Sequence, residues 1–518
     1  MRRSMKRLPS IIAVPLLVSL LAAAPASPFA APPKPAARDA ARTEIDLVVF
    51  DPQELLALAV GDRLPSDFLV LDAKGLLLSS RRADAGGTHL EFLDPTEPRA
   101  HASIFVRAGR VAGTIEAPGD RRIVLASDAP GMSRVRHEDA RKDLPCGLGT
   151  HDLRPPVGQA ADGGVAGAAC TADSGRMVDL LVVYTDAAVT QAGSEQTLLD
   201  SIAWVVADSN GIYSGTGIQL QARLVGTARL EGYAQNASMA DDLYQLTDVD
   251  DGIIDGVHAT RDALGADLVA MIRGDGGGAC GVAWLANSTS AADMAPYGFS
   301  VTALGCIGGR TFTHELGHNM GCCHAPGDGG GCLSGGVTPY AVGNRFTGTD
   351  ALQYRTVMAY SPGTRIPRFS SPTTIWAGTA TGIANERDNG RSIGEMRPTF
   401  ANFRCSVDGL GTCGTGASCV EAHGARGCAD GSCCLLVCAA DPTCCSDGWD
   451  SSCVERALQT CVGTCAADSN ADFLVNGADL AALLGAWGSA NAVSDLNDDG
   501  MVNGSDLAIL LGAWGPCR

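Results

Sequence analysis

The stretch HELGHNMGCCH, residues 314–324, places three imidazoles and one carboxylate at a spacing that suits a single metal ion. Residues four apart share one face of a helix, so His314 and His318 can offer two nitrogens to the same ion. Gly321 can end the helix, because glycine accepts backbone angles that other residues resist, and the chain can then bring in His324. Three protein ligands leave one coordination position open, as in catalytic zinc sites, and Glu315 lies beside it.

The full pattern H-E-x-x-H-x-x-G-x-x-H is followed downstream by TVMAYSPGTRIPRFSSP, with Met358 in a turn-like context. These two elements are typical of metzincins, and HELGHN resembles the zinc helix of the reprolysin/adamalysin-like group. The segment from about 176 to 404 is similar to their secreted bacterial members. The resemblance implies a catalytic zinc held by His314, His318 and His324, with Glu315 as general base and Met358 as an apolar floor.

Two positions deserve comparison with the family pattern. Adamalysins usually carry Asp after the third histidine, where this chain has Ala325, so the hydrogen bonding that supports the following loop is in question. Tyr360 follows Met358 by two residues, as in astacin- and serralysin-type turns. The resemblance implies that Tyr360 can approach the metal and contact the transition state, and a packed, hydrogen-bonded turn tyrosine is the alternative.

Composition sets bounds on the whole chain. A length of 518 residues predicts several domains. The net charge of −19 excludes a nucleic-acid binder, which needs a basic face. Twenty cysteines, mostly clustered, indicate an oxidising compartment.

The N-terminal region predicts export and maturation. Residues 1–30 combine a basic start, a short apolar core and small residues, as in a secretory signal peptide. Another run long enough to span a bilayer is not found, so we expect no transmembrane segment after cleavage. Residues 31–175 contain short apolar runs separated by turns and then a Gly/Ala-rich linker, which indicate a β-rich propeptide.

Cys146 lies near the end of that propeptide. A thiolate is a good zinc ligand, so Cys146 could occupy the fourth position on the metal, as a cysteine switch does in relatives of this family. A disulfide between Cys146 and Cys170 is the alternative, because sequence alone does not assign pairings.

Residues 176–404 predict the catalytic domain. Strands expected at MVDLLVVYT, IQLQARLVGTARL, ADLVAMIRG, CGVAWLA and YGFSVTAL alternate with helical stretches. This order predicts an α/β (α+β) domain with a twisted mixed sheet, and the zinc helix comes last, at 311–320. Cys280 and Cys306 lie at the ends of predicted strands, and we expect a disulfide between them to link these ends.

Residues 405–464 form a cysteine-rich module. So short a segment buries little core, and disulfides would offset that deficit. A zinc ribbon is the rival, but C-x-x-C pairs of the required form are absent from this segment.

Residues 465–518 contain an internal repeat in which each copy ends in LLGAWG. The repeat resembles a type I dockerin, an all-α pair of EF-hand-like units, although Phe473 replaces the usual loop glycine in the first copy. Oxygen donors at alternating positions suit Ca²⁺, and the expected ligands are Asp468, Asn470, Asp472, Asn476, Asp479, Asp495, Asn497, Asp499, Asn503 and Asp506. We expect the two helices to pack through Leu480, Leu484, Leu507 and Leu511.

Together these features predict a secreted, extracellular or cell-surface zinc endopeptidase that acts on proteins or peptides and is made as a zymogen. Its C-terminal modules could attach it to a cohesin-like or cell-surface partner. The alternative is a catalytically spent scaffold protein that acts only through those modules, and the complete zinc motif argues against it.

Overall fold

The computed structural model describes residues 45–65, 75–84, 86–146, 154–155, 173, 175–328, 336–407, 413, 417–429, 433–434, 437–438, 441, 443–460, 467, 474–489, 494, 496 and 501–516. The predicted signal peptide at 1–30 and Cys170 lie outside the described residues. So do six of the expected calcium ligands, which are Asp468, Asn470, Asp472, Asp495, Asn497 and Asp499.

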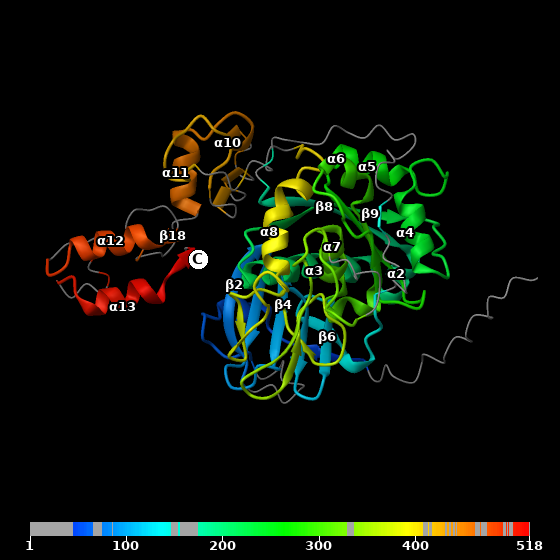
Figure 1. Ribbon diagram of the computed structural model, residues 1–518, viewed down its shortest axis with the longest axis horizontal. Coiled ribbons are helices and arrows are strands. Elements are labelled where there is room, and N and C mark those ends of the chain that lie inside the picture. Colours follow the sequence, from blue (N-terminus) through cyan, green and yellow to red (C-terminus); the bar gives the residue numbers. More distant parts are fainter. Residues whose placement is uncertain are drawn as a thin grey trace, which may run out of the picture. The chain divides into compact units, whose positions relative to one another are not determined.

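The N-terminal region forms one seven-stranded antiparallel sheet in the order β1-β7-β6-β5-β4-β3-β2 (Figure 1). Apart from β1 it is a simple meander, and glycines with positive φ at 109, 119 and 131 make tight turns between strands. The sheet buries its own apolar cluster, which includes Leu90 and Ile104. Its elements are β1 (Ile45–Val49), α1 (Pro52–Ala57), β2 (Leu77–Asp84), β3 (Gly87–Leu93), β4 (His101–Arg107), β5 (Arg110–Ala117), β6 (Arg121–Ala129), β7 (Met132–Asp139) and η2 (Ala140–Lys142).

A five-stranded mixed sheet follows, in the order β11-β12-β10-β8-β9. The continuous apolar run of β8 is buried along its whole length, as expected for an inner parallel strand covered on both faces. Edge strand β11 alone runs antiparallel to its neighbour. The mixed α/β prediction is therefore confirmed, with strands β8 (Met177–Thr185), β9 (Gln221–Leu230), β10 (Leu268–Arg273), β11 (Gly281–Ala283) and β12 (Phe299–Ala303). The expected disulfide between Cys280 and Cys306 is also present.

Helix α3 (Glu195–Thr216) contacts both sheets. Ser194 caps its N-terminus, and Gly217 ends it with a left-handed backbone. The helix is buried almost throughout, because one side packs on β9 and another on the N-terminal sheet. Trp204 Nε1 donates to Ser103 Oγ of β4 at 3.1 Å. The N-terminal sheet therefore shares buried contacts with the catalytic region.

The remaining elements complete the catalytic region. The sequence patterns predicted few regular elements after the zinc helix, but the structure contains a small sheet, a hairpin and helix α8 there, because these short segments are stabilised by long-range packing. The elements are α2 (Asp186–Ala192), α4 (Met239–Thr247), α5 (Gly256–Leu264), α6 (Ala291–Met294), η3 (Ala295–Tyr297), η4 (Leu304–Gly309), α7 (Thr311–Asn319), β13 (Arg345–Thr347), β14 (Gln353–Arg355), β15 (Thr364–Arg365), β16 (Ile375–Trp376), β17 (Thr379–Ala380) and α8 (Asn389–Phe400).

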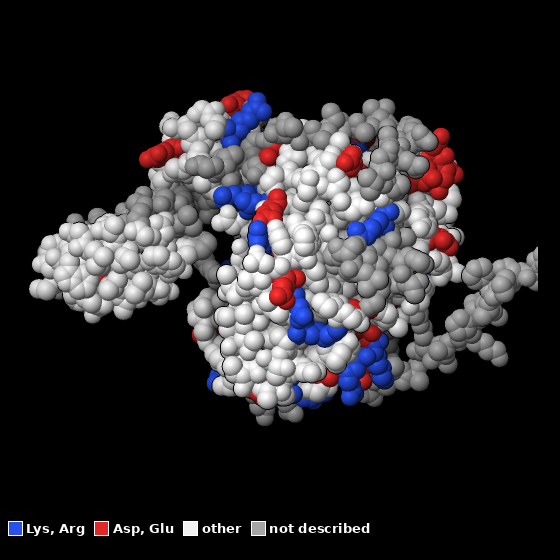
Figure 2. Space-filling model, viewed as in Figure 1, with Lys and Arg blue, Asp and Glu red and all other residues white. Residues whose placement is uncertain are grey.

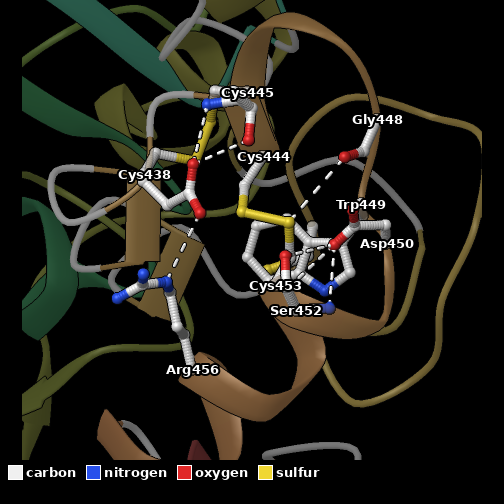
Figure 3. The surroundings of a disulfide bond; sticks show 12 residues. Cys438, Cys444, Cys445, Gly448, Trp449, Asp450, Ser452, Cys453 and Arg456 are labelled. Carbon is white, nitrogen blue, oxygen red and sulfur yellow. Dashed lines mark hydrogen bonds and ion pairs between the residues drawn. A yellow bond between two sulfur atoms is a disulfide. The ribbon is translucent and has the colours of Figure 1, made fainter.

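The cysteine-rich module contains α10 (Thr443–Ser446) and α11 (Ser451–Thr460) and is crosslinked as predicted. Trp449 is fully buried, and Figure 3 shows it next to the disulfide between Cys444 and Cys453. Its indole N–H donates to the carbonyl of Cys419 at 2.9 Å. The other disulfides described here join Cys413 to Cys434, Cys419 to Cys428 and Cys438 to Cys445. Covalent bonds, with one buried tryptophan, thus replace a large apolar core.

The C-terminal repeat contains helices α12 (Gly477–Gly485) and α13 (Gly504–Gly512), with a short antiparallel pair of β18 (Leu474–Val475) and β19 (Gly515–Pro516). The predicted packing residues were partly wrong. Leu484 and Leu511 are about half exposed at 52% and 53%, whereas Leu483 and Leu510 are buried. Leu480 and Leu507 do pack against the buried cluster. Residues three apart share a helix face, so the core follows the i, i+3 spacing and not the i, i+4 spacing.

Acidic side chains are concentrated locally. The segment between α4 and α5 exposes Asp248, Asp250 and Asp251, and Figure 2 shows acidic residues gathered over that part of the drawn face. Among the described residues, no helix combines the length and apolar character needed to cross a membrane.

Two buried histidines of the N-terminal sheet predict a pH-dependent stability. Burial lowers the pKa of His89 and of His101 well below the usual value for histidine. The unfolded chain therefore binds protons below about pH 6.5 that the folded chain does not, and the free energy of unfolding falls as pH drops. We expect a loss of up to about 1.4 kcal/mol per histidine per pH unit below that value, measured by denaturant unfolding of the full chain.

The His101→Leu variant supplies the control. Neither ring nitrogen of His101 has a hydrogen-bond partner, so leucine removes the titration without removing a bond. Its stability should depend less steeply on pH between 6.5 and 5.5. An unchanged slope in His101→Leu, compared with the wild type over the same pH range, would contradict the assignment.

Candidate active site

Helix α7 carries the first part of the site and is buried over its whole length (Figure 1). Asn319, at its C-terminal end, fixes the helix to the sheet. The Asn319 side-chain amide donates to the carbonyls of Trp284 at 3.0 Å and Phe299 at 2.9 Å. The helix is therefore held next to edge strand β11, where it presents its histidines.

The turn after α7 brings in the third histidine. Gly321 has a φ of +84°, in the left-handed region that favours glycine, as the sequence predicted. The three Nε2 atoms converge, at 3.1 Å between His314 and His324, 3.2 Å between His314 and His318, and 3.0 Å between His318 and His324. All three rings are buried.

Backbone carbonyls orient two of these rings. His314 Nδ1 lies 2.9 Å from the carbonyl oxygen of Val357, and His318 Nδ1 lies 2.8 Å from that of Cys322. A proton held on Nδ1 leaves the Nε2 lone pair directed at the common point, as is usual for metal-binding histidines. Burial lowers the pKa of both His314 and His318 well below the usual value, which keeps the rings neutral.

This donor set fits zinc. Nitrogens about 2.0–2.1 Å from a tetrahedral zinc lie about 3.3 Å from one another, close to the separations of the three Nε2 atoms. Three buried imidazoles that turn their Nε2 atoms toward one point exchange hydrogen bonds to water for contacts with each other. A divalent cation at their centre would satisfy all three nitrogens at once.

Glu315 lies next to this point with an unsatisfied oxygen. Its side chain is fully buried, and its Oε1 atom has no hydrogen-bond partner. Burial raises the pKa of Glu315 to about 8. Strand β11 passes so close that a Cβ placed on Gly281 would lie 2.3 Å from Glu315 Oε1. The fold thus holds a proton-accepting group in a confined space beside the three histidines.

Met358 lies beneath the zinc helix. It is fully buried, and a Cβ placed on Gly317 would lie only 2.6 Å from its Sδ atom. The glycine within HELGH therefore allows the methionine to approach the helix. The resemblance implied that Met358 forms an apolar floor under the zinc site, and its side chain lies against the helix that carries His314 and His318.

Tyr360 and Asp328 support the loop that follows His324. Tyr360 Oη lies 3.0 Å from His324 Nε2, so the tyrosine lies among the predicted metal ligands. Ala325 leaves no carboxylate directly after His324, but Asp328 accepts the Tyr360 backbone N–H at 2.8 Å and pairs with Arg345. The sequence analysis missed Asp328, and the only signal for it was an aspartate three residues after the expected position.

Cys146 reaches the same point from the N-terminal region. Its Sγ lies 3.9 Å from His318 Nε2, and its thiol donates to Glu315 Oε2 at 3.4 Å. The sulfur and the three histidine nitrogens lie within 4.8 Å of one another. The arrangement is that of a fourth donor facing the metal position.

The expected calcium ligands are only partly described. Asp479 Oδ2 accepts the Asn476 N–H at 2.9 Å, and Asp506 Oδ2 accepts the Asn503 N–H at 2.7 Å. Both aspartates are fully buried. The two copies of the repeat thus share one local geometry at the start of their helices.

A glycine-to-alanine pair tests the packing of the helix on the methionine. Gly317→Ala should lower the free energy of unfolding by about 1–2 kcal/mol, because overpacking outweighs the gain in helix propensity. Gly394→Ala in helix α8 is the matched control, since a Cβ there meets nothing within 4 Å. It should leave stability unchanged or increase it by up to about 1 kcal/mol. Equal effects in the two variants, measured by thermal denaturation, would contradict this packing.

Comparison with known proteins agrees with this geometry. Residues 174–387 match the family described as metallo-peptidase family M12B, reprolysin-like. A peptidyl-Asp metalloendopeptidase of Xanthomonas campestris pv. campestris is 28% identical over 324 residues, which cover 61% of this chain and 73% of that protein. A peptidyl-Asp metalloendopeptidase of Stenotrophomonas maltophilia strain R551-3 is 27% identical over 317 residues, 58% of this chain and 70% of that protein.

A solved structure titled "Structure of a chaperone-substrate complex" aligns at 18% identity with a TM-score of 0.36, over 58% of this chain and 39% of that chain, and this score is too low to support an inference. The family match and the relatives, together with the convergence of the histidines, carry the conclusion. This chain is a zinc metalloendopeptidase, and its residues 174–387 are similar to reprolysin-like metallopeptidases.

Proposed function

We propose that the chain is a secreted zinc endopeptidase made as a zymogen, in which His314, His318 and His324 hold the metal and Glu315 is the general base. One observation carries the proposal, which is the meeting of three Nε2 atoms at 3.0–3.2 Å beside a buried carboxylate. Zinc, when bound there, supplies a Lewis acid that lowers the pKa of water and polarises the scissile carbonyl.

Glu315 transfers the proton. Its buried carboxylate accepts a proton from the attacking water and then gives it to the departing amine. Burial raises the pKa of Glu315, so its carboxylate form is a stronger base toward the water proton than an exposed carboxylate. Tyr360 Oη, which lies 3.0 Å from His324 Nε2, is close enough to donate a hydrogen bond to the developing oxyanion.

The N-terminal sheet acts as a propeptide. Its last segment brings Cys146 to the histidines and to Glu315, where a thiolate would take the fourth ligand position and keep water out. Cleavage in the linker up to residue 175 would release that segment. The proposal also includes the domain limits: the propeptide and linker end at residue 175, the catalytic domain at 404 and the cysteine-rich module at 464.

The relatives suggest the substrate class. Both carry the name peptidyl-Asp metalloendopeptidase. We infer that this chain also cleaves peptide bonds beside aspartate.

The C-terminal region would attach the enzyme to a partner. Trp487 and Trp514, which packing arguments place in a core, are 48% and 50% exposed, as are the neighbouring Leu484 and Leu511 at 52% and 53%. An exposed apolar surface of this kind suits a cohesin-like or cell-surface partner. Calcium would bind the loops whose described members are Asn476, Asp479, Asn503 and Asp506.

Replacement of the general base gives the direct test. Glu315→Gln should retain the zinc content of the wild type and lower kcat by about 10²–10⁴-fold, because the amide cannot accept the proton. Zinc is measured by mass spectrometry and turnover with a fluorogenic peptide, and Glu231→Gln on the surface serves as the control. Full activity in Glu315→Gln would refute the assignment.

The zymogen proposal is tested with Cys146→Ser. A hydroxyl is a poorer zinc ligand than a thiolate. The unprocessed Cys146→Ser chain should therefore cleave peptide at a rate at least about tenfold above the unprocessed wild type. The processed forms should be equally active, since residue 146 has been removed from both. Equal latency of the two unprocessed chains would show that Cys146 does not restrain the site.

A further inference from the structure

Two buried arginines lie directly behind the turn that contains Met358. Arg355 Nη1 donates to the carbonyl of Ala359 at 3.0 Å, and Arg365 Nη2 donates to the same carbonyl at 3.3 Å. Ala359 lies between Met358 and Tyr360, so both guanidiniums are fixed next to the active site. They are 3% and 8% exposed.

Among the described residues, neither arginine forms an ion pair with a carboxylate of the catalytic region. Arg355 Nη2 lies 3.9 Å from Asp143 Oδ2, which is its only ion pair among the described residues. Arg365 bonds only to carbonyl oxygens there, and its buried Nε has no partner. Burial lowers the pKa of Arg355 to about 9 and also lowers that of Arg365, and Asp143 opposes both changes.

Two carboxylates near these arginines, Asp143 and Glu116, come from the N-terminal region. Asp143 contacts Arg355, and Glu116 lies 3.5 Å from Arg310 and also opposes the fall in the pKa of Arg355. Arg122, the cation that holds Asp143 with two hydrogen bonds of 2.9 Å, belongs to the same region. If that region is released, Arg355 loses its one described ion pair, and Glu315 stays near Arg365 without pairing to it among the described contacts. Loss of a paired carboxylate is costly for a buried charge.

The segment that carries Asp143 lies along the edge of the sheet as a peptide would. The carbonyl of Pro145 accepts the backbone N–H of Cys280, the residue before β11, at 3.1 Å. Main-chain pairing with an exposed strand edge is a common way to bind an extended peptide. Cys146 then lies at the histidines, and three residues earlier the Asp143 carboxylate faces the arginines.

A pocket lies beside Asp143, and Arg122 and Arg355, the arginines that pair with Asp143, both line it. Arg355, Ser361, Gly363, Thr364 and Arg365 line it from the catalytic region, and Glu116 and Arg122 are among the residues that line it from the N-terminal sheet. The catalytic side of the pocket thus consists of small polar residues and two arginines. Such a lining suits a carboxylate, because a guanidinium can bind it with two parallel hydrogen bonds.

We propose that Arg355 and Arg365 form the specificity site for an acidic substrate side chain beside the scissile bond, and that Asp143 occupies this site in the unprocessed chain in the manner of a substrate. The inference rests on the proposed zymogen and peptidase functions, and it names the residues that select the substrate. Once the N-terminal region leaves, a substrate aspartate replaces Asp143 as the counter-charge.

The test compares two fluorogenic peptides on the processed enzyme, identical except for Asp or Asn beside the cleaved bond. Wild type should favour the Asp peptide by at least about tenfold in kcat/KM, because a site built for a charged group rejects its neutral analogue. Arg355→Gln and Arg365→Gln should each lower that ratio at least about fivefold, while Arg391→Gln, an exposed arginine on α8, keeps the wild-type ratio.

A second arm does not depend on the folding of the arginine variants. The synthetic peptides KDLPSG and KNLPSG reproduce residues 142–147 with Cys146 replaced by serine, and they differ only at Asp143. The first should inhibit the processed wild-type enzyme at least about tenfold more strongly.

The outcomes separate the proposals. An enzyme that cleaves neither peptide and binds no zinc would refute the peptidase proposal itself. An active enzyme with no preference for Asp, equal inhibition by the two peptides, or a preference that survives in both folded arginine variants would overturn the specificity site alone.

Discussion

The convergence of three neutral imidazoles on one point is the constraint on which the rest of the structure depends. Each ring must be buried, oriented through Nδ1 and free of positive charge. The Asn319 side chain, the left-handed backbone at Gly321 and the carbonyls of Val357 and Cys322 all serve that requirement. The same lack of water also raises the pKa of Glu315, so its carboxylate form is a stronger base than an exposed one.

The chain places side chains of its own N-terminal region against these buried groups. Cys146 faces the histidines and Glu315, and Asp143 faces Arg355. Helix α3 receives the N-terminal sheet through contacts such as that of Trp204 with Ser103. The segment that contains Asp143 and Cys146 would therefore cover both the zinc site and the proposed specificity site. The same residues would keep the enzyme inactive and occupy the place of the substrate.

The sequence predicted those features that depend on local spacing. The histidine motif, the glycine after it, Met358 and the strand at 177–185 are all contained in short windows. The strand and the left-handed glycine are found as predicted, and the three histidines lie close together, as the proposed zinc site requires. The pairing of Cys280 with Cys306 was predictable because both lie at strand ends. Cys322, in contrast, is a buried thiol that takes no part in a disulfide, and no local pattern distinguishes it from its neighbour Cys323.

Long-range contacts were not predictable in this way. Asp328 supports Tyr360 where the family pattern places an aspartate directly after the third histidine, and only the folded loop brings the two together. Arg355 meets Asp143 across more than two hundred residues, so no local pattern connects them. Leu483 and Leu510, and not Leu484 and Leu511, form the core of the repeat, because the contact between helices selects one of two adjacent faces.

Anomalous diffraction at the zinc absorption edge, from crystals of the processed protein, tests the central claim most directly. The account predicts one strong peak about 2.0–2.1 Å from the Nε2 atoms of His314, His318 and His324. No peak at that point in protein purified without chelators, or a zinc ion bound elsewhere with these rings turned apart, would contradict it.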